Sequence, residues 1–268
     1  MNDQQLREEA LAKVPAITLG FWIIKILATT LGETAGDTVT MTWLGETTAS
    51  PVPNGYLIGT AIFGVLLIVL VWAQIKANGF NAWLYWATIA ASTTAGTTLA
   101  DFADRSIGLG YVGGSLLLLS CVLLSLFAWY RSLGTVDINT IVSPKAEAFY
   151  WVTITFSQTL GTALGDWAAD AGLGYSGGAM VFGALLAVLA ILYFATRISR
   201  VFLFWAAFIL TRPLGATVGD FLDKPVDKGG LELSRPLASA VLAIAILALI
   251  MLLPQRAGRH PGRDGSTA

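Results

Sequence analysis

Charged residues are scarce in this chain, at 12% of its 268 residues. A soluble domain carries about 25% charged residues, so the sequence lacks the polar surface that a water-facing exterior requires. The net charge of −1 provides no basic field, which excludes nucleic acid as a partner. With 55% hydrophobic residues, the chain is instead predicted to have the lipid bilayer as its partner.

Cysteine and histidine occur once each. Cys121 lies inside an apolar run, so an intrachain disulfide framework is excluded. His260 lies in the polar C-terminal tail, which excludes a histidine-based zinc site in the membrane, a bis-histidine haem and a serine–histidine hydrolase. No glycine-rich phosphate loop follows a strand pattern. We therefore predict that the protein is not an enzyme and has no cofactor.

Long apolar runs occupy most of the chain. A helix needs roughly 20 mainly apolar residues to cross a bilayer, and these runs predict an all-α integral membrane protein with eight transmembrane helices. The predicted helices lie near residues 16–36, 56–75, 83–100, 112–130, 148–165, 177–196, 201–219 and 236–253. The polar residues 1–13 are predicted to form an N-terminal segment, and residues 255–268 a disordered tail.

Basic residues distinguish the two sides of the predicted bundle. An even number of spans places both termini on one side, where the termini and the connecting loops hold ten Lys and Arg residues. The opposite loops hold four, namely Arg105, Lys224, Lys228 and Arg235. The positive-inside rule therefore predicts that both termini are cytoplasmic.

The most informative pattern is an ungapped repeat of the sequence. Four segments begin with a tryptophan, at Trp22, Trp86, Trp151 and Trp205. Ten residues later each has a glycine, at Gly32, Gly96, Gly161 and Gly215. Fifteen residues after the tryptophan each has an aspartate, at Asp37, Asp101, Asp166 and Asp220. Four matches at one spacing indicate repeat units at 14–80, 81–145, 146–199 and 200–254.

In these tandem two-helix units with a characteristic tryptophan, the chain resembles a family of bacterial multi-pass membrane proteins described as four repeats of unknown function. The resemblance covers roughly residues 22–253 and includes all four tryptophans. It implies this topology, in the inner (plasma) membrane of a bacterium. It implies no activity, substrate or cofactor.

Two spans per unit bring every copy into the membrane from the same side. Parallel repeats of this kind are related by an axis along the membrane normal, so a pseudo-four-fold arrangement is predicted. The four tryptophans then lie near the cytoplasmic interface, where we interpret them as anchors rather than ligand-binding groups. The four aspartates lie near the outer interface, because fifteen residues of helix span roughly 22 Å.

Ionisable residues within the odd-numbered helices all fall on one helix face. Positions three, seven, eleven and fifteen after each tryptophan form a row of residues four apart. Besides the four aspartates, this row holds Lys25, Glu33, Arg212, Gln158, Thr97 and Thr162. A charge in hydrocarbon costs roughly 2.5–3.5 kcal/mol, so these side chains should face protein or water, and the repeat glycines allow the helices to pack closely. We therefore expect the odd-numbered helices inside and the even-numbered helices outside.

The four aspartates allow two interpretations. One is an acidic ring that attracts a cation at the outer mouth of a pathway, and the other is local capping of the loops that follow. Three copies add a second carboxylate, at Asp104, Asp170 and Asp223. This outer layer either suits a hard cation such as Mg²⁺, Ca²⁺ or Mn²⁺ or is a solvated acidic loop. The sequence does not specify a metal.

Lys25, Glu33 and Arg212 break the repeat and also allow two interpretations. Either they form an ion or proton relay, or they form a structural network in which Lys25 pairs with Glu33 and Arg212 pairs with a nearby aspartate. Pro213 follows Arg212 and is expected to kink the seventh helix beside that charge.

We therefore expect a transporter or channel for a small ion, preferably a cation such as a divalent metal, or a proton-coupled ion. Its pathway would run between the first, third, fifth and seventh helices, with the four aspartates recruiting the ion and Glu33 exchanging it or a proton. If Lys25 and Arg212 bind the substrate instead, the ion is an anion. The alternative class is a non-transporting sensor, regulator or scaffold, and the sequence leaves oligomerisation open.

Overall fold

The computed structural model describes residues 13–258, which fold into helices with one isolated backbone bridge between Pro15 and Ala257. Most of the predicted N-terminal segment 1–13 and the end of the predicted tail 255–268 lie outside these described residues. The two ends of the described chain lie together, because Ala16 N–H donates to the Arg256 carbonyl at 2.9 Å and Gly258 N–H donates to the Val14 carbonyl at 2.8 Å.

The long helices follow the apolar runs of the sequence closely. They are α2 (Leu19–Asp37), α3 (Gly55–Lys76), α4 (Ala82–Asp101), α5 (Tyr111–Leu133), α6 (Pro144–Ala168), α7 (Gly174–Ala195), α8 (Arg200–Asp223) and α9 (Arg235–Leu252). Capping residues account for the starts that differ from the predicted bounds. α2 begins after Thr18, whose hydroxyl accepts the Phe21 N–H, and α6 begins at Pro144 because Ser143 caps its first turn. α8 runs through Pro213 as one helix.

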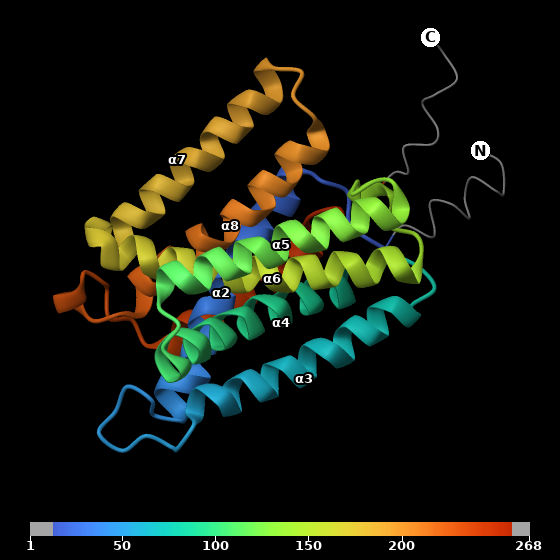
Figure 1. Cartoon of the computed structure of the whole chain (residues 1–268). Coiled ribbons are helices and arrows are strands. Elements are labelled where there is room, and N and C mark those ends of the chain that lie inside the picture. The colour runs from blue at the N-terminus through green and yellow to red at the C-terminus, as the bar shows by residue number, and fades with distance from the viewer. Residues whose placement is uncertain (1–12, 259–268) are drawn as a thin grey trace, which may run out of the picture.

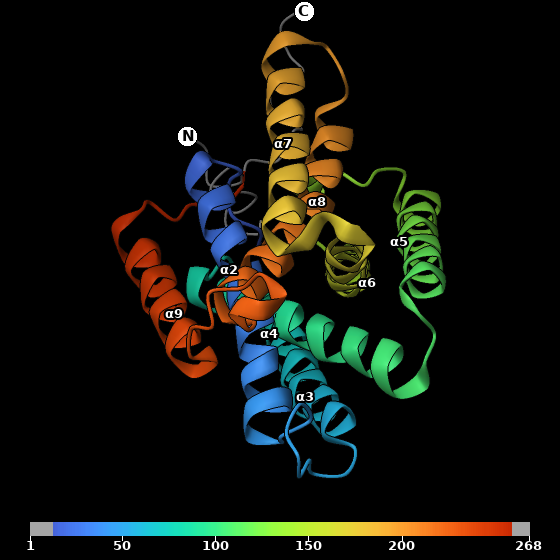
Figure 2. The same cartoon turned by 90° about the vertical axis from the view of Figure 1, so that its left-hand side faces the viewer.

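The helices form an inner and an outer set (Figures 1 and 2). The inner helices α2, α4, α6 and α8 contact one another in a closed order, α2 with α4, α4 with α6, α6 with α8, and α8 with α2. Around them, α3 packs on α4, α5 on α6, α7 on α8, and α9 on α2. Each outer helix therefore covers the inner helix of the following sequence repeat, and α9 returns to the first.

The repeat glycines lie where neighbouring inner helices come closest. A Cβ added to Gly32 would lie 2.1 Å from Thr93 Oγ1, and one added to Gly215 would lie 2.2 Å from Thr29 Oγ1. A Cβ at Gly161 would lie 2.2 Å from Arg212 Cγ. Real Cβ atoms do not approach other atoms this closely, so these contacts require glycine. A Cβ added to Gly96 would lie 2.9 Å from the Cβ atom of Gln158.

Alanine at one of these glycines is expected to separate two inner helices. Gly161→Ala should lower the free energy of unfolding by about 1–3 kcal/mol, because the added methyl group overpacks the contact with Arg212. Gly64→Ala is the matched control, since Gly64 lies in α3 and a Cβ there meets no atom within 4 Å. There the gain in helix propensity should leave stability unchanged or raise it by up to about 1 kcal/mol. Unfolding in mixed detergent micelles, followed by circular dichroism, measures the stability of both variants. Equal changes in their free energy of unfolding would contradict the close packing at Gly161.

Large apolar side chains on the outer helices face away from the protein, as Ile68 of α3, Leu124 of α5 and Phe194 of α7 illustrate. Among the described residues, five helical segments are long and apolar enough to cross a membrane, namely Gly55–Lys76, Tyr111–Leu133, Pro144–Ala195, Arg200–Asp223 and Arg235–Leu252. These segments identify a membrane protein. α2 and α4 are not among them, because the polar side chains that they bury among the inner helices lower their hydropathy.

The repeat tryptophans pack against other parts of the protein, and their role as anchors at the cytoplasmic interface stays a prediction. Trp86, Trp151 and Trp205 are buried, and Trp22 is partly buried, in one aromatic cluster at the N-terminal ends of the inner helices. Trp205 Nε1 donates to the Val136 carbonyl at 2.9 Å. Their indole rings pack against other aromatic side chains, as Trp205 does on Trp129 and Trp151 on Tyr85, so they also contribute to the packing of the inner helices.

Candidate functional site

The charged centre of the inner helices is an ion pair between Arg212 of α8 and Glu33 of α2. Arg212 Nη2 lies 2.9 Å from Glu33 Oε2, and both side chains are buried. The same nitrogen donates to Thr97 Oγ1 of α4 at 2.5 Å and to Thr162 Oγ1 of α6 at 2.6 Å. Arg212 Nη1 donates to the Thr29 carbonyl at 3.2 Å. One guanidinium group thus binds groups on all the other inner helices.

This pairing corrects the structural network expected from the sequence. Arg212 pairs with Glu33 rather than with an aspartate, and Lys25 is not the partner of Glu33. The reason is that α8 lies beside α2, with position seven of one helix facing position eleven of the other, whereas Lys25 and Glu33 are two turns apart on one helix. Lys25 Nζ instead lies over the Phe208 ring, 4.2 Å from its centroid, as a cation–π contact.

Two polar side chains near this centre are fully buried without a hydrogen-bond partner among the described residues. One is Lys25, whose Nζ has only the aromatic contact. The other is Gln158 of α6, whose amide oxygen and amide nitrogen are both unpaired. Burying such groups costs desolvation free energy that a hydrogen bond would otherwise offset. The interior between the inner helices therefore contains hydrogen-bonding groups that the described residues leave unused.

The four repeat aspartates are buried and lie in two halves, each with its own cation. Lys224 Nζ pairs with Asp37 Oδ2 and lies 3.0 Å from Asp220 Oδ1. On the other side, Arg105 Nε lies 2.7 Å from Asp101 Oδ1, and its Nη2 lies 3.9 Å from Asp166 Oδ2. The aspartates are therefore not a ring of free carboxylates, because each pair contacts a cation from the segment that follows an inner helix.

The sequence reasoning missed Lys224 and Arg105 as part of the site. Each lies four residues after a repeat aspartate, Asp220 and Asp101, and this spacing brings side chains together on a helix. Burial alone would lower the pKa of Lys224, but Asp220, Asp37 and Asp223 raise it well above its ordinary value. For Arg105, Asp101 and Asp166 likewise outweigh burial and raise the pKa. Both side chains are therefore positively charged at neutral pH.

The second carboxylates do not form a common outer layer. Asp104 is partly buried and Asp170 is exposed, whereas Asp223 at the end of α8 is buried. Asp223 has Arg235 Nε at 3.8 Å and Lys224 Nζ at 4.0 Å. The prediction of one layer is corrected because the segments after α4 and α6 are π-helical turns, while α8 continues as an α-helix to Asp223 and turns that carboxylate inward.

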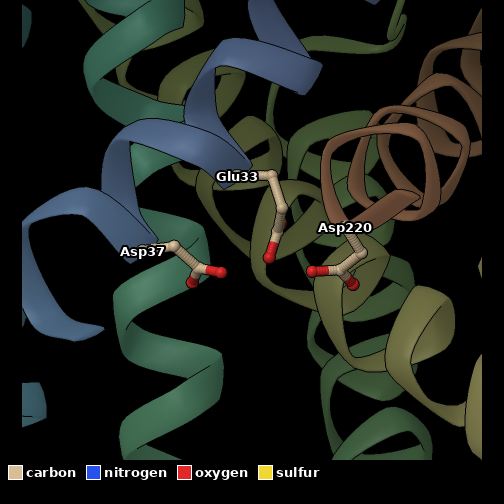
Figure 3. Close-up of side chains that lie close together, drawn as sticks. All are labelled: Glu33, Asp37 and Asp220. Carbon is tan, nitrogen blue, oxygen red and sulfur yellow. The ribbon is translucent and has the colours of Figure 1, made fainter. Parts of the chain in front are cut away.

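Three carboxylates converge where the central ion pair meets the aspartates. Glu33, Asp37 and Asp220 each offer an oxygen atom, and these atoms lie within 4.8 Å of one another (Figure 3). Figure 3 shows the side chains of α2 and α8 pointing toward a common space. All three are buried, at 2% exposure or less. Within the described part of the chain, this is the group of acidic side chains whose geometry suits a metal ion.

Comparison with known proteins identifies a family but no characterised relative. Four consecutive segments, residues 20–80, 84–135, 149–199 and 203–256, match the Repeat of Unknown Function (DUF347). No curated protein and no solved structure matches the chain. Because the four matches cover most of the sequence, the chain belongs to the DUF347 repeat family, as a protein with four tandem copies of that repeat.

Proposed function

We propose that this protein transports a small ion, preferably a cation, through the polar interior between α2, α4, α6 and α8. The observation that carries the proposal is the set of buried charges on the common inner faces of these helices, from Lys25 through Arg212 and Glu33 to the aspartates. A charge in the membrane interior is costly and usually marks a pathway or a relay. Carboxylates outnumber cations toward the aspartate end, which favours a cation.

The proposal includes a topology of eight membrane-spanning helices related by a pseudo-four-fold axis along the membrane normal. Two observations support it, the closed order of contacts among the inner helices and the meeting of the two ends of the described chain. With the distribution of Lys and Arg residues, the positive-inside rule favours cytoplasmic termini. The membrane proposed is the bacterial inner membrane.

Ion flux into liposomes tests this function directly. Glu33→Gln and Asp166→Asn are expected to abolish flux while retaining the fold, because each removes a carboxylate from the proposed pathway. Asp227→Asn is the matched control, since Asp227 is an exposed carboxylate in the turn after α8, and its flux should equal that of the wild type. Flux preserved in both pathway variants would remove their proposed roles.

The competing function is a non-transporting sensor, regulator or scaffold. The ion pair of Arg212 with Glu33, fully buried and bonded across the inner helices, favours this alternative insofar as it acts as a structural clamp. Absence of flux from the wild-type protein across a panel of cations and anions would support it. Flux of anions alone would instead assign substrate binding to Lys25 and Arg212.

A further inference from the structure

We infer that Glu33, Asp37 and Asp220, together with Asp223, form a binding site for a divalent cation, and that the ammonium group of Lys224 occupies this site as an internal competitor. The ion class is a hard divalent cation such as Mg²⁺, Ca²⁺ or Mn²⁺, which prefers oxygen ligands. The inference deepens the proposed function by assigning a substrate class and a binding site. Binding itself does not depend on the proposed function, but transport of the bound ion does.

The geometry of the three central carboxylates matches one shared ion. Their nearest oxygen atoms lie within 4.8 Å of one another. Two ligands of one ion, each at 2.0–2.6 Å, lie up to about 5 Å apart. Figure 3 shows the carboxylates of Glu33, Asp37 and Asp220 directed toward the space that such an ion would fill. They come from α2 and α8, which pack against each other, so the backbone fixes their positions.

Unpaired oxygen atoms at the same place provide an independent indication of a ligand. Both carboxylate oxygens of Asp223 are buried and accept no hydrogen bond from the described residues, and the side chain is 4% exposed. Asp37 Oδ1 is also buried and unpaired. Lys224 Nζ and Arg235 Nε lie 4.0 Å and 3.8 Å from Asp223, but neither donates a hydrogen bond to it. These atoms therefore have coordination capacity that the protein itself does not use.

The ammonium group of Lys224 lies among the carboxylates, at the position proposed for the ion. Its Nζ pairs with Asp37, lies 3.0 Å from Asp220 Oδ1, and lies 4.0 Å from Asp223 Oδ1. It also lies 3.6 Å from Met41 Sδ. A lysine ammonium is a compact charge on a flexible stem, so it can leave without moving the backbone. A metal ion and this ammonium group cannot share the carboxylates.

A cavity of about 270 Å³ lies beside the site at Asp223. Its lining includes Thr42, Asp223, Glu232 and Arg235. Asp223 belongs to both the cavity and the site, and Arg235 Nε lies 3.9 Å from Asp37 Oδ2. The cavity therefore borders the proposed site at Asp223, on the side of the segments that follow α2 and α8.

A divalent ion fits the charges of the ionised site. When Lys224 leaves, four carboxylates remain beside two guanidinium groups, Arg212 on Glu33 and Arg235 beside Asp223. With all four carboxylates ionised, two negative charges remain, and one divalent cation neutralises them.

The other half of the aspartate layer is a natural comparison. Asp101 and Asp166 also share one cation, Arg105. However, position eleven in these repeats is Thr97 or Thr162 instead of a glutamate, so the third carboxylate is replaced by a hydroxyl. Arginine also keeps its charge and its forked donors more firmly than lysine. This half therefore lacks the third carboxylate that the proposed divalent site requires.

The experiment measures binding rather than transport. The purified full-length protein is treated with EDTA and titrated with MnCl₂, MgCl₂ or CaCl₂ at constant ionic strength, with isothermal calorimetry and thermal unfolding as readouts. Lys224→Gln should bind the preferred ion on the order of tenfold more tightly than the wild type, because an internal positive charge is removed. Asp220→Asn should lose binding, and Asp227→Asn, which removes an exposed carboxylate in the turn after α8, should bind as the wild type does.

The signs of these effects separate the inference from a purely structural role of Lys224. If Lys224 only clamps the aspartates, Lys224→Gln is less stable and gains no stabilisation from a divalent ion, which would overturn the inference. If Lys224→Gln does not fold, the response of the wild-type protein to divalent ions tests the site. Its melting temperature should rise with up to about 10 mM divalent ion, in the range of weak protein sites, and that of Asp220→Asn should not. Equal responses would refute the site.

Measurements of binding and of flux distinguish failure of the divalent site from failure of the proposed transport function. Divalent binding that requires Asp220, with no flux in liposomes, would support the site and contradict the proposed transport. Flux that is abolished by Glu33→Gln, with no divalent binding by the wild type or Lys224→Gln, would support transport and overturn this site.

Discussion

Arg212→Met is expected to lower the free energy of unfolding by about 3–5 kcal/mol, one of the largest effects of a single change in this protein. The substitution removes the guanidinium group from Glu33 Oε2 at 2.9 Å and leaves a buried carboxylate without its cation. Thr97, Thr162 and the Thr29 carbonyl lose a donor at the same time. Buried polar groups left unpaired add to the cost. Reversible unfolding in mixed micelles, followed by circular dichroism, provides the measurement.

A second substitution shows that the loss comes from the uncompensated charge. Arg212→Met combined with Glu33→Gln should recover most of the stability, because no buried ion then lacks a partner. Arg131→Met is the control for removing an arginine, since Arg131 is exposed at the end of α5, and it should change stability by less than about 0.5 kcal/mol. A double variant as unstable as Arg212→Met alone would refute the ion pair as the cause.

Trp205→Ala is expected to cost a comparable 3–5 kcal/mol, about the range for a buried aromatic residue. The indole ring packs on Trp129 at 5.8 Å and on Phe204 at 5.4 Å between centroids, both nearly edge to face. Its removal leaves a cavity where the inner helices meet, and the Val136 carbonyl loses the donor at 2.9 Å. Lipid cannot enter this protein-filled space, so the lost contacts are not replaced.

Trp72→Ala tests whether the effect is specific to the aromatic cluster. Trp72 lies on the outer helix α3 and is 63% exposed, so its removal should change the free energy of unfolding by less than about 0.5 kcal/mol. Circular dichroism suits both variants, since tryptophan fluorescence changes with the substitution itself. Comparable losses for Trp72→Ala and Trp205→Ala would contradict the view that the repeat tryptophans stabilise the inner helices.

Helix positions could be predicted because each depends on residues near in sequence. The apolar run near 56–75 became α3 at Gly55–Lys76, and that near 236–253 became α9 at Arg235–Leu252. The ends that shifted depend on capping, as at Ser143, whose hydroxyl accepts the Ala146 N–H at 3.2 Å. The repeat was equally visible, since equal spacing requires no knowledge of contacts.

Pairing within the candidate site could not be predicted in the same way. The spacing of Asp101 and Arg105 indicates a contact on one helix, and the structure has it at 2.7 Å. The contact between Lys224 and Asp37 joins residues 187 apart in sequence, and no local pattern indicates it. Lys224 was counted only as a loop residue for orientation, although its place four residues after Asp220 was an available signal.

The sequence by itself determined the four repeats, the approximate limits of the helices, and the row that gathers the charged side chains on one face of each of the inner helices α2, α4, α6 and α8. The periodicity of a helix decides these features, because residues four apart share a face in any fold. Only the tertiary structure decided that Arg212 binds Glu33, that Lys224 lies among Asp37, Asp220 and Asp223, and that the tryptophans form one buried cluster. Those outcomes depend on which faces of distant segments meet, and long-range packing sets them.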